Sequence, residues 1–280
     1  MNPLELIRMS EPASGTLTIE VPDDPLARAL RAWPDRPALA LLRAIEAALY
    51  DAPPEGVLDI GCGNGKFAAV INLSKAVGVD LLARDIALAR DTGLYRDLLH
   101  TDARRMPFAD NSIQYAICNS TLEHIACDGD VVKEVSRVLR PGGTFAFTVP
   151  SENKEKTLLY GRESVSVTAD EARRYREWFT DRWHHCHYRA QSEWKNLLRD
   201  NRLEVVELRR YETLRSGFIG DALGYTRIVR EPIPELRKEQ STADEVRLAI
   251  LYQALVDYWR DDVASPDDGV GGYYVRARRM

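Results

Sequence analysis

From residue 56 onward, short apolar runs alternate with amphipathic stretches, and this alternation constrains the fold more than any other feature of the sequence. The apolar runs cover residues 57–60, 76–82, 113–118, 144–149 and 203–208, and the helix-like stretches between them cover 66–74, 83–90, 131–139 and 191–201. Such alternation is typical of βα units around a largely parallel sheet. Continuously apolar runs are typical of strands that helices cover on both faces. The pattern therefore predicts an α/β fold.

Other segments flank or interrupt this alternation. A helical pattern runs over residues 37–50, and Pro141, Gly142 and Gly143 predict a helix stop before the strand at 144–149. Residues 272–278 alternate like a last strand, whereas the polar 151–190 and the irregular 212–265 do not continue the βα pattern. We expect an N-terminal lid at 1–36 and one domain at 37–280. Within that domain, 151–190 and 212–265 would be insertions that serve the substrate side or oligomerisation.

Composition excludes several classes of protein. The sequence contains 38 Lys and Arg and 43 Asp and Glu, which gives a net charge of −5. A dedicated nucleic-acid binder normally carries a basic surplus. The four cysteines form no CxxC pair, no apolar run approaches the ~18 residues of a membrane span, and no secretory signal is visible. We therefore expect a cytoplasmic protein with no nucleic-acid partner and no stable membrane insertion.

The most informative stretch places three glycines, Gly61, Gly63 and Gly65, between the strand at 57–60 and the next helix. Glycines there let the backbone turn tightly and present N–H groups to a ligand beside a helix N-terminus. The spacing is neither the G-x-G-x-x-G of dinucleotide binders nor a Walker A motif. Asp59, just before the loop, would repel a pyrophosphate and attract an ammonium group.

Two further acids follow at strand-length intervals. Asp80 ends the run at 76–82, at the place where doubly wound folds hold a ribose diol. Asp102 follows after another such interval, and taken singly it would more often be a solvated loop acid.

Together these features resemble the class I S-adenosylmethionine-dependent methyltransferases. The resemblance rests on four ordered blocks at residues 57–67, 77–82, 102–125 and 134–151, and it is looser over the rest of the chain. It implies a Rossmann-like seven-stranded sheet in the order 3-2-1-4-5-7-6, with helices on both faces and strand 7, at 272–278, antiparallel. The implied cofactor is S-adenosyl-L-methionine, with S-adenosyl-L-homocysteine as product.

The resemblance also implies roles for individual residues near the cofactor. Asp59, Gly61, Cys62 and Gly63 would line its methionine part. Asp80 would take the ribose hydroxyls, with Leu81 against the adenine. Asp102 would accept from the adenine amino group beside Ala103, and Asn119 would meet the amino-acid part.

On the substrate side, the segment after the fourth strand lacks the Asn/Asp-Pro-Pro-aromatic motif of enzymes that methylate adenine or glutamine nitrogen. It also lacks the Pro-Cys nucleophile of cytosine-C5 enzymes, and so resembles small-molecule methyltransferases. His124 is the nearest candidate base, although a histidine that only stabilises the connection after the strand explains it at least as well.

Residues 179–188 hold an unusual group of histidines and aromatics. We expect His184, His185 or His187 to supply a general base, and Trp183 and Tyr188 to form an aromatic wall for the substrate; packing of the following helix is the alternative. Adjacent histidines point in diverging directions, so we expect no metal in this segment.

The favoured function is methyl transfer to an O, N or C nucleophile of a small organic molecule, with natural-product or other specialised biosynthesis as the expected setting. A cofactor-binding regulatory module without catalysis is one alternative. A nicotinamide oxidoreductase is the least favoured, because Asp59 and the glycine spacing count against it. The helical residues 242–259 are expected to form a lid or a homodimer contact.

Overall fold

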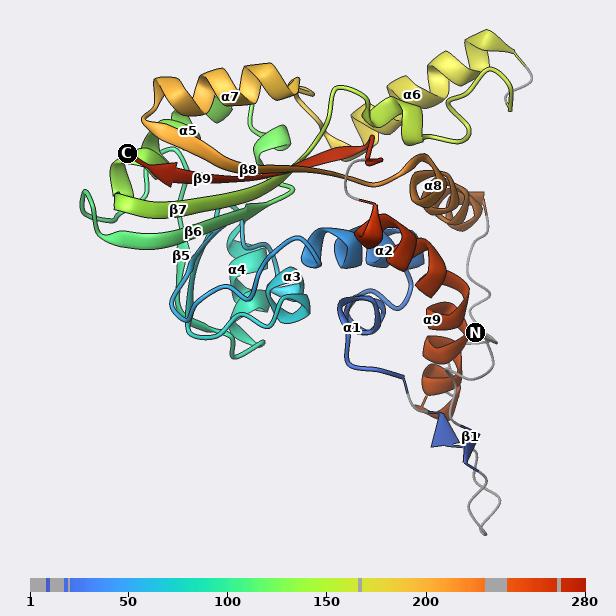
Figure 1. Ribbon diagram of the computed structural model, residues 1–280. Coiled ribbons are helices and arrows are strands. Elements are labelled where there is room, and N and C mark those ends of the chain that lie inside the picture. The colour runs from blue at the N-terminus through green and yellow to red at the C-terminus, as the bar shows by residue number, and fades with distance from the viewer. Residues whose placement is uncertain (1–8, 11–17, 20, 166–167, 230–240, 266–267) are drawn as a thin grey trace.

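The computed structural model describes residues 9–10, 18–19, 21–165, 168–229, 241–265 and 268–280 (Figure 1). Much of the expected N-terminal lid, and parts of the expected insertions at 151–190 and 212–265, therefore lie outside the described residues. No helix among the described residues combines the length and the apolar character needed to cross a membrane.

A seven-stranded sheet forms the centre of the molecule. Its strands are β3 (Leu58–Ile60), β4 (Ala76–Asp80), β5 (Tyr95–His100), β6 (Ile113–Asn119), β7 (Leu139–Pro150), β8 (Leu203–Tyr211) and β9 (Gly272–Arg279). Their order is β5-β4-β3-β6-β7-β9-β8, and β9 runs antiparallel to both of its neighbours. The expected order 3-2-1-4-5-7-6 with an antiparallel strand 7 is confirmed. A separate two-residue pairing joins β1 (Met9–Ser10) to β2 (Thr18–Ile19).

Helices cover both faces of the sheet (Figure 1). On one face, α5 (Asp128–Val138) and α7 (Gln191–Asp200) share a core with Leu58, Ile60 and Phe145. On the other face, α2 (Pro37–Ala47) and α3 (Lys66–Val70) share a core with Val57 and Ile117. Because successive strand residues point to opposite faces, the continuously apolar runs fill both cores.

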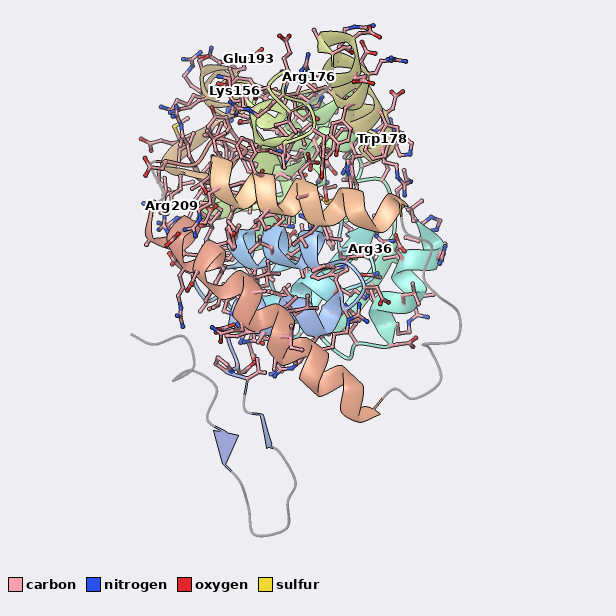
Figure 2. All side chains as sticks on the ribbon, turned by 90° about the vertical axis from the view of Figure 1, so that its right-hand side faces the viewer. Arg36, Lys156, Arg176, Trp178, Glu193 and Arg209 are labelled. Atoms are coloured by element: carbon pink, nitrogen blue, oxygen red, sulfur yellow. The ribbon has the colours of Figure 1, made fainter. Side chains whose placement is uncertain are left out.

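The structure describes five further helices. They are α1 (Pro25–Ala32), α4 (Ala83–Arg90), α6 (Ala169–Trp183), α8 (Leu214–Val229) and α9 (Ser241–Ala264), with short 3-10 turns η2 (Leu122–His124) and η3 (Lys154–Thr157). Helices α8 and α9 lie across α2 (Figure 2). Leu26 and Leu30 of α1 are fully buried, so α1 is part of the packed helical layer.

Three local details differ from the sequence-based expectations. Helix α5 ends at Val138, one residue before the end of the helical stretch expected at 131–139. Strand β7 begins directly afterwards, so Pro141, Gly142 and Gly143 lie inside it, at an irregular stretch of its pairing with β6. Helix α3 ends at Val70, before the left-handed residues Asn72 and Lys75. Strand β5 has no apolar run in its sequence, because this edge strand has no fully buried side chain.

Candidate active site

The expected cofactor-binding residues gather at one edge of the sheet. Four neighbouring parallel strands, β5, β4, β3 and β6, end there. Asp102 and Ala103 follow β5, Asp80 and Leu81 lie at the end of β4, the glycine loop follows β3, and Asn119 ends β6. Such an edge is where ligands bind in open α/β sheets.

The glycine loop needs glycine for two separate reasons. Gly61 has a φ of 69°, and a Cβ there would lie 2.4 Å from both γ atoms of Thr121. Gly63 has a φ of 52°, but a Cβ there would meet no atom within 4 Å. Positive φ is costly for residues with a side chain. Gly61 is thus packed against protein, whereas Gly63 faces open space that a ligand can approach.

Asp80 links the loop to the next helix. Its carboxylate accepts hydrogen bonds from the backbone N–H groups of Gly63 and Leu82, both at 2.8 Å. Each oxygen keeps further lone pairs for a ligand. Next to it, the Leu81 side chain is 63% exposed, which leaves an apolar surface beside the carboxylate.

Asp59 lies beneath the loop and not on its open side. It is buried, and Tyr95 donates a hydrogen bond to it at 2.7 Å from β5. Burial raises the pKa of Asp59 to about 6, helped by the nearby Asp80 charge and opposed by the Tyr95 hydrogen bond. Cys62, the residue after Gly61, is also buried. Any contact of Asp59 with a ligand therefore involves a partly desolvated carboxylate.

Replacing Asp59 by asparagine should increase stability at neutral pH. Since the folded-state pKa lies above the unfolded one, the wild-type protein loses stability as the pH rises from about 4 through about 6. We expect Asp59→Asn to raise the free energy of unfolding by about 1–3 kcal/mol at pH 7 and to have little of this benefit at pH 4. Urea denaturation of both proteins across this range measures the difference. A difference that does not change with pH would contradict the expectation.

Asp102 and Asn119 are both engaged with protein groups. Arg104 pairs with both carboxylate oxygens of Asp102, and its hydrogen bonds lower the pKa of this acid. The Asn119 amide donates to Glu46 at 3.0 Å, and its oxygen accepts from Thr148 at 2.7 Å. Asn119 keeps one further N–H, so its capacity toward a ligand is limited.

Glu46 is a site-adjacent residue that the sequence did not single out. This acid of α2 is 1% exposed. It accepts hydrogen bonds from Arg43, Asn119, Ser120 and Tyr211. The network joins α2 to the ends of β6 and β8. The sequence feature that could have indicated Glu46 is the presence of an acidic residue within an otherwise apolar face of a helix.

Two of the expected histidines meet beside a second unexpected acid. His124 and His185 have ring centroids 5.1 Å apart, and Nε2 of His124 lies 3.9 Å from Oε1 of Glu123. Burial raises the pKa of Glu123 to about 8 and lowers that of His185 to about 3; the pKa of His124 is also lowered by burial. The three groups therefore favour neutral forms. Glu123 directly precedes His124 in the sequence, and this adjacency is the one sequence feature that could have indicated a role for Glu123.

The other two histidines do not join this group through their side chains. His184 contributes its backbone carbonyl, 3.2 Å from His124 Nδ1, and adopts a left-handed conformation. Nε2 of His187 lies 2.9 Å from Asp128, which also pairs with Arg189. Burial would raise the pKa of Asp128, but these partners outweigh it and lower the pKa to about 2.

Trp183 and Tyr188, which were expected to form one aromatic wall, contact different neighbours. The Tyr188 hydroxyl lies 2.8 Å from His185 Nδ1, so Tyr188 contacts the histidine pair directly. Trp183 is 42% exposed, and its ring is tilted against that of Phe179 at a centroid distance of 6.3 Å.

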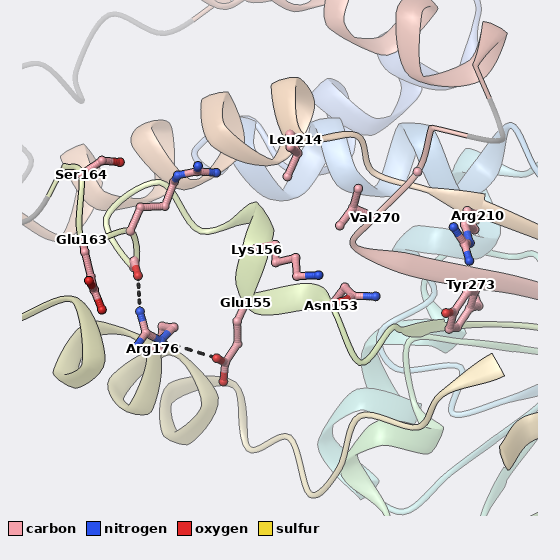
Figure 3. Close-up of a pocket in the computed structure, with 13 residues that line it drawn as sticks. Asn153, Glu155, Lys156, Glu163, Ser164, Arg176, Arg210, Leu214, Val270 and Tyr273 are labelled. Atoms are coloured by element: carbon pink, nitrogen blue, oxygen red, sulfur yellow. Dashed lines mark hydrogen bonds and ion pairs between the residues drawn. The ribbon is translucent and has the colours of Figure 1, made fainter. Parts of the chain in front are cut away.

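A separate pocket of about 850 Å³ opens near η3 (Figure 3). Its lining comes from η3, the loop after it, α6, the end of β8, the start of α8 and the segment before β9. Lys156, Arg162 and Arg210 give it a basic character, while Arg176 pairs with Glu155. None of the expected cofactor or histidine residues lines it.

Comparison with known proteins agrees with this geometry. The family model described as "Methyltransferase domain" matches residues 58–147. "Probable methyltransferase PMT8" of Arabidopsis thaliana is 34% identical over 40% of this chain and 19% of its own length. The 27-O-demethylrifamycin SV methyltransferase of Amycolatopsis mediterranei is 31% identical over 40% of this chain and 48% of its own length. This chain therefore spans less than half the length of these relatives.

A solved structure extends the likeness of the fold. The protein from Thermotoga maritima described as an S-adenosylmethionine-dependent methyltransferase and possible histamine N-methyltransferase superposes with a TM-score of 0.53. It covers 91% of this chain and 100% of its own, at 15% identity. The strand order, the glycine loop and the matched domain agree with one another: residues 58–147 match the methyltransferase domain family, on a fold shared with S-adenosylmethionine-dependent methyltransferases.

Proposed function

We propose that the protein transfers a methyl group from S-adenosylmethionine to an oxygen, nitrogen or carbon nucleophile of a small organic molecule. The observation that carries this proposal is the open backbone at Gly63, flanked by the Asp80 carboxylate and the exposed Leu81, inside the methyltransferase domain. This arrangement offers an apolar surface and hydrogen-bond acceptors, whereas a pyrophosphate would be repelled by the acids.

The residues fit the cofactor as follows. Asp80 has lone pairs left for the two ribose hydroxyls, and the exposed Leu81 would lie against the adenine, with the Ala103 backbone nearby. Asp102 would accept from the adenine amino group. The backbone at Gly61, Cys62 and Gly63, with Asp59 beneath it and the spare N–H of Asn119, would surround the methionine part. When bound, S-adenosylmethionine supplies an electrophilic sulfonium methyl group, and the chain's main contribution is to position a nucleophile against it.

On the acceptor side, Glu123, His124 and His185 can hold or accept a proton, and Tyr188 orients His185. A small-molecule acceptor is supported by the names of the rifamycin-type relative and of the structural neighbour. The N-terminal segment as a lid, and residues 151–190 and 212–265 as substrate-side or dimer-forming insertions, belong to the same proposal.

The proposal also covers the partners of the protein and its location in the cell. The net charge of −5 supports an absence of nucleic-acid partners. The four free cysteines, two of them exposed, support a reducing, cytoplasmic location.

Binding of the cofactor is the direct test. S-adenosylmethionine should raise the melting temperature, because a ligand that binds only the folded state stabilises it. Asp80→Ala should weaken binding by about 1–3 kcal/mol, since charge-assisted hydrogen bonds are lost. Isothermal titration calorimetry measures the Kd, and Asp91→Ala, which changes an exposed acid at the far end of α4, should leave it unchanged.

Two results would favour the alternatives. Stabilisation by NAD and not by S-adenosylmethionine would indicate an oxidoreductase. Tight cofactor binding with no methylated product in cell extracts supplied with methyl-labelled cofactor would indicate a binding module without catalysis.

A further inference from the structure

The contact between Glu123, His124 and His185 brings together donor atoms from two distant parts of the chain. Glu123 and His124 belong to η2, directly after β6, whereas His185 follows α6. One nitrogen or oxygen ligand atom from each of the three lies within 4.8 Å of the others. Cys186 fixes this juxtaposition, because its backbone N–H donates to the Glu123 carbonyl at 2.7 Å.

Hydrogen bonds on the far side of the rings orient the two histidines. Nδ1 of His124 lies 3.2 Å from the His184 carbonyl, which can only accept, so Nδ1 carries the proton and Nε2 keeps its lone pair toward Glu123. Nδ1 of His185 is occupied by the Tyr188 hydroxyl at 2.8 Å. Outer contacts of this kind hold the rings of metal-binding histidines in place.

Glu123 has an unsatisfied oxygen at the same place. The residue is 3% exposed, and its Oε2 has no hydrogen-bond partner among the described residues. A buried carboxylate without a partner is costly. A cation bound by Glu123 and the two imidazoles would offset that cost and favour the ionised carboxylate.

We propose that Glu123, His124 and His185 bind one divalent transition-metal ion. Two imidazole nitrogens and one carboxylate favour an ion such as Zn²⁺ or Fe²⁺ over Mg²⁺ or Ca²⁺, which prefer oxygen ligands. Three protein ligands leave coordination positions open, as in catalytic metal sites. The spacing of the histidines within residues 184–187 predicted no metal site. The site proposed here instead takes its ligands from two segments that are far apart in the sequence.

This inference also narrows the acceptor, and in that respect it rests on the proposed function. A divalent ion favours the deprotonated form of a hydroxyl that binds to it, the proton passing to water. The acceptor class is then a small molecule with an ionisable hydroxyl group, and the bond that forms is between its oxygen and the methyl carbon as the sulfur–methyl bond breaks.

Metal binding can be measured without acceptor or cofactor. The full chain, stripped with a chelator, is dialysed against Zn²⁺ alone and its zinc content is determined by elemental analysis. We expect one zinc ion per wild-type chain and at least tenfold weaker binding by His185→Ala and Glu123→Gln. His184→Asn is the matched control: it removes a neighbouring histidine but keeps the carbonyl, and asparagine tolerates the left-handed backbone.

The outcomes separate the two proposals. Failure of the wild-type chain to bind zinc stoichiometrically, or equal losses in His184→Asn and His185→Ala, would overturn the metal site. Circular dichroism of each variant excludes unfolding as the cause, and visible absorption of bound Co²⁺ gives an independent readout of the ligands. Calorimetry with S-adenosylmethionine on the metal-free chain tests the proposed function by itself. Cofactor binding without zinc binding would reject the metal site alone. Zinc binding without cofactor binding would reject the proposed methyl transfer alone.

Discussion

Replacing Lys154 by methionine is expected to lower the free energy of unfolding by about 3–5 kcal/mol. The Lys154 ammonium lies 2.5 Å from both carboxylate oxygens of Glu212, and both side chains are about nine-tenths buried. Without the lysine, an uncompensated carboxylate stays buried. Since burial already raises the pKa of Glu212, the variant would take up a proton there, and the loss should be smaller at pH 5 than at pH 7. Urea denaturation at both values measures it.

Two controls make this prediction specific. Lys154→Met combined with Glu212→Gln should recover more than half of the loss, because the buried charge is removed. Lys75→Met, which breaks an exposed pair with Glu55, should cost much less, since surface pairs contribute little. Equal effects of Lys154→Met and Lys75→Met would show that burial does not control the strength of the pair.

The second large effect is expected on catalysis by the histidines. His124→Ala and His185→Ala should each lower kcat by about 10²–10⁴-fold, the usual contribution of a group positioned for proton transfer, whether it takes up the proton itself or holds a metal ion that favours its loss. Of the four candidate histidines, these two lie beside Glu123. His184→Asn and His187→Ala should have much smaller effects, since His184 acts through its carbonyl and Asp128 keeps Arg189 when His187 is lost.

The measurement is kcat at saturating acceptor and cofactor, together with the Kd of S-adenosylmethionine. The Kd should stay near the wild-type value in all four variants, because none of these residues lies in the glycine loop. Four similar, modest losses of kcat would contradict a proton-transfer role for any of them. Catalysis would then depend on positioning alone.

Local sequence determined the strands, most helices and the glycine loop. The alternating apolar runs predicted four of the parallel strands and β8, because a buried strand must be apolar on both faces. Helix α4 was expected at residues 83–90 and lies there. The positions of Gly61 and Gly63 were recognised because positive φ selects glycine regardless of what surrounds it. The strand order, in contrast, came from the family resemblance.

Only the tertiary structure determined which polar groups meet. Asp59 is separated by 36 residues from its partner Tyr95, Lys154 by 58 from Glu212, and His124 by 60 from the His184 carbonyl. Edge strand β5 lacked a periodic apolar signal because none of its side chains is fully buried. Local patterns report the burial and backbone conformation of each residue, whereas the desolvation and pairing of a charge depend on segments that folding brings together from far along the chain.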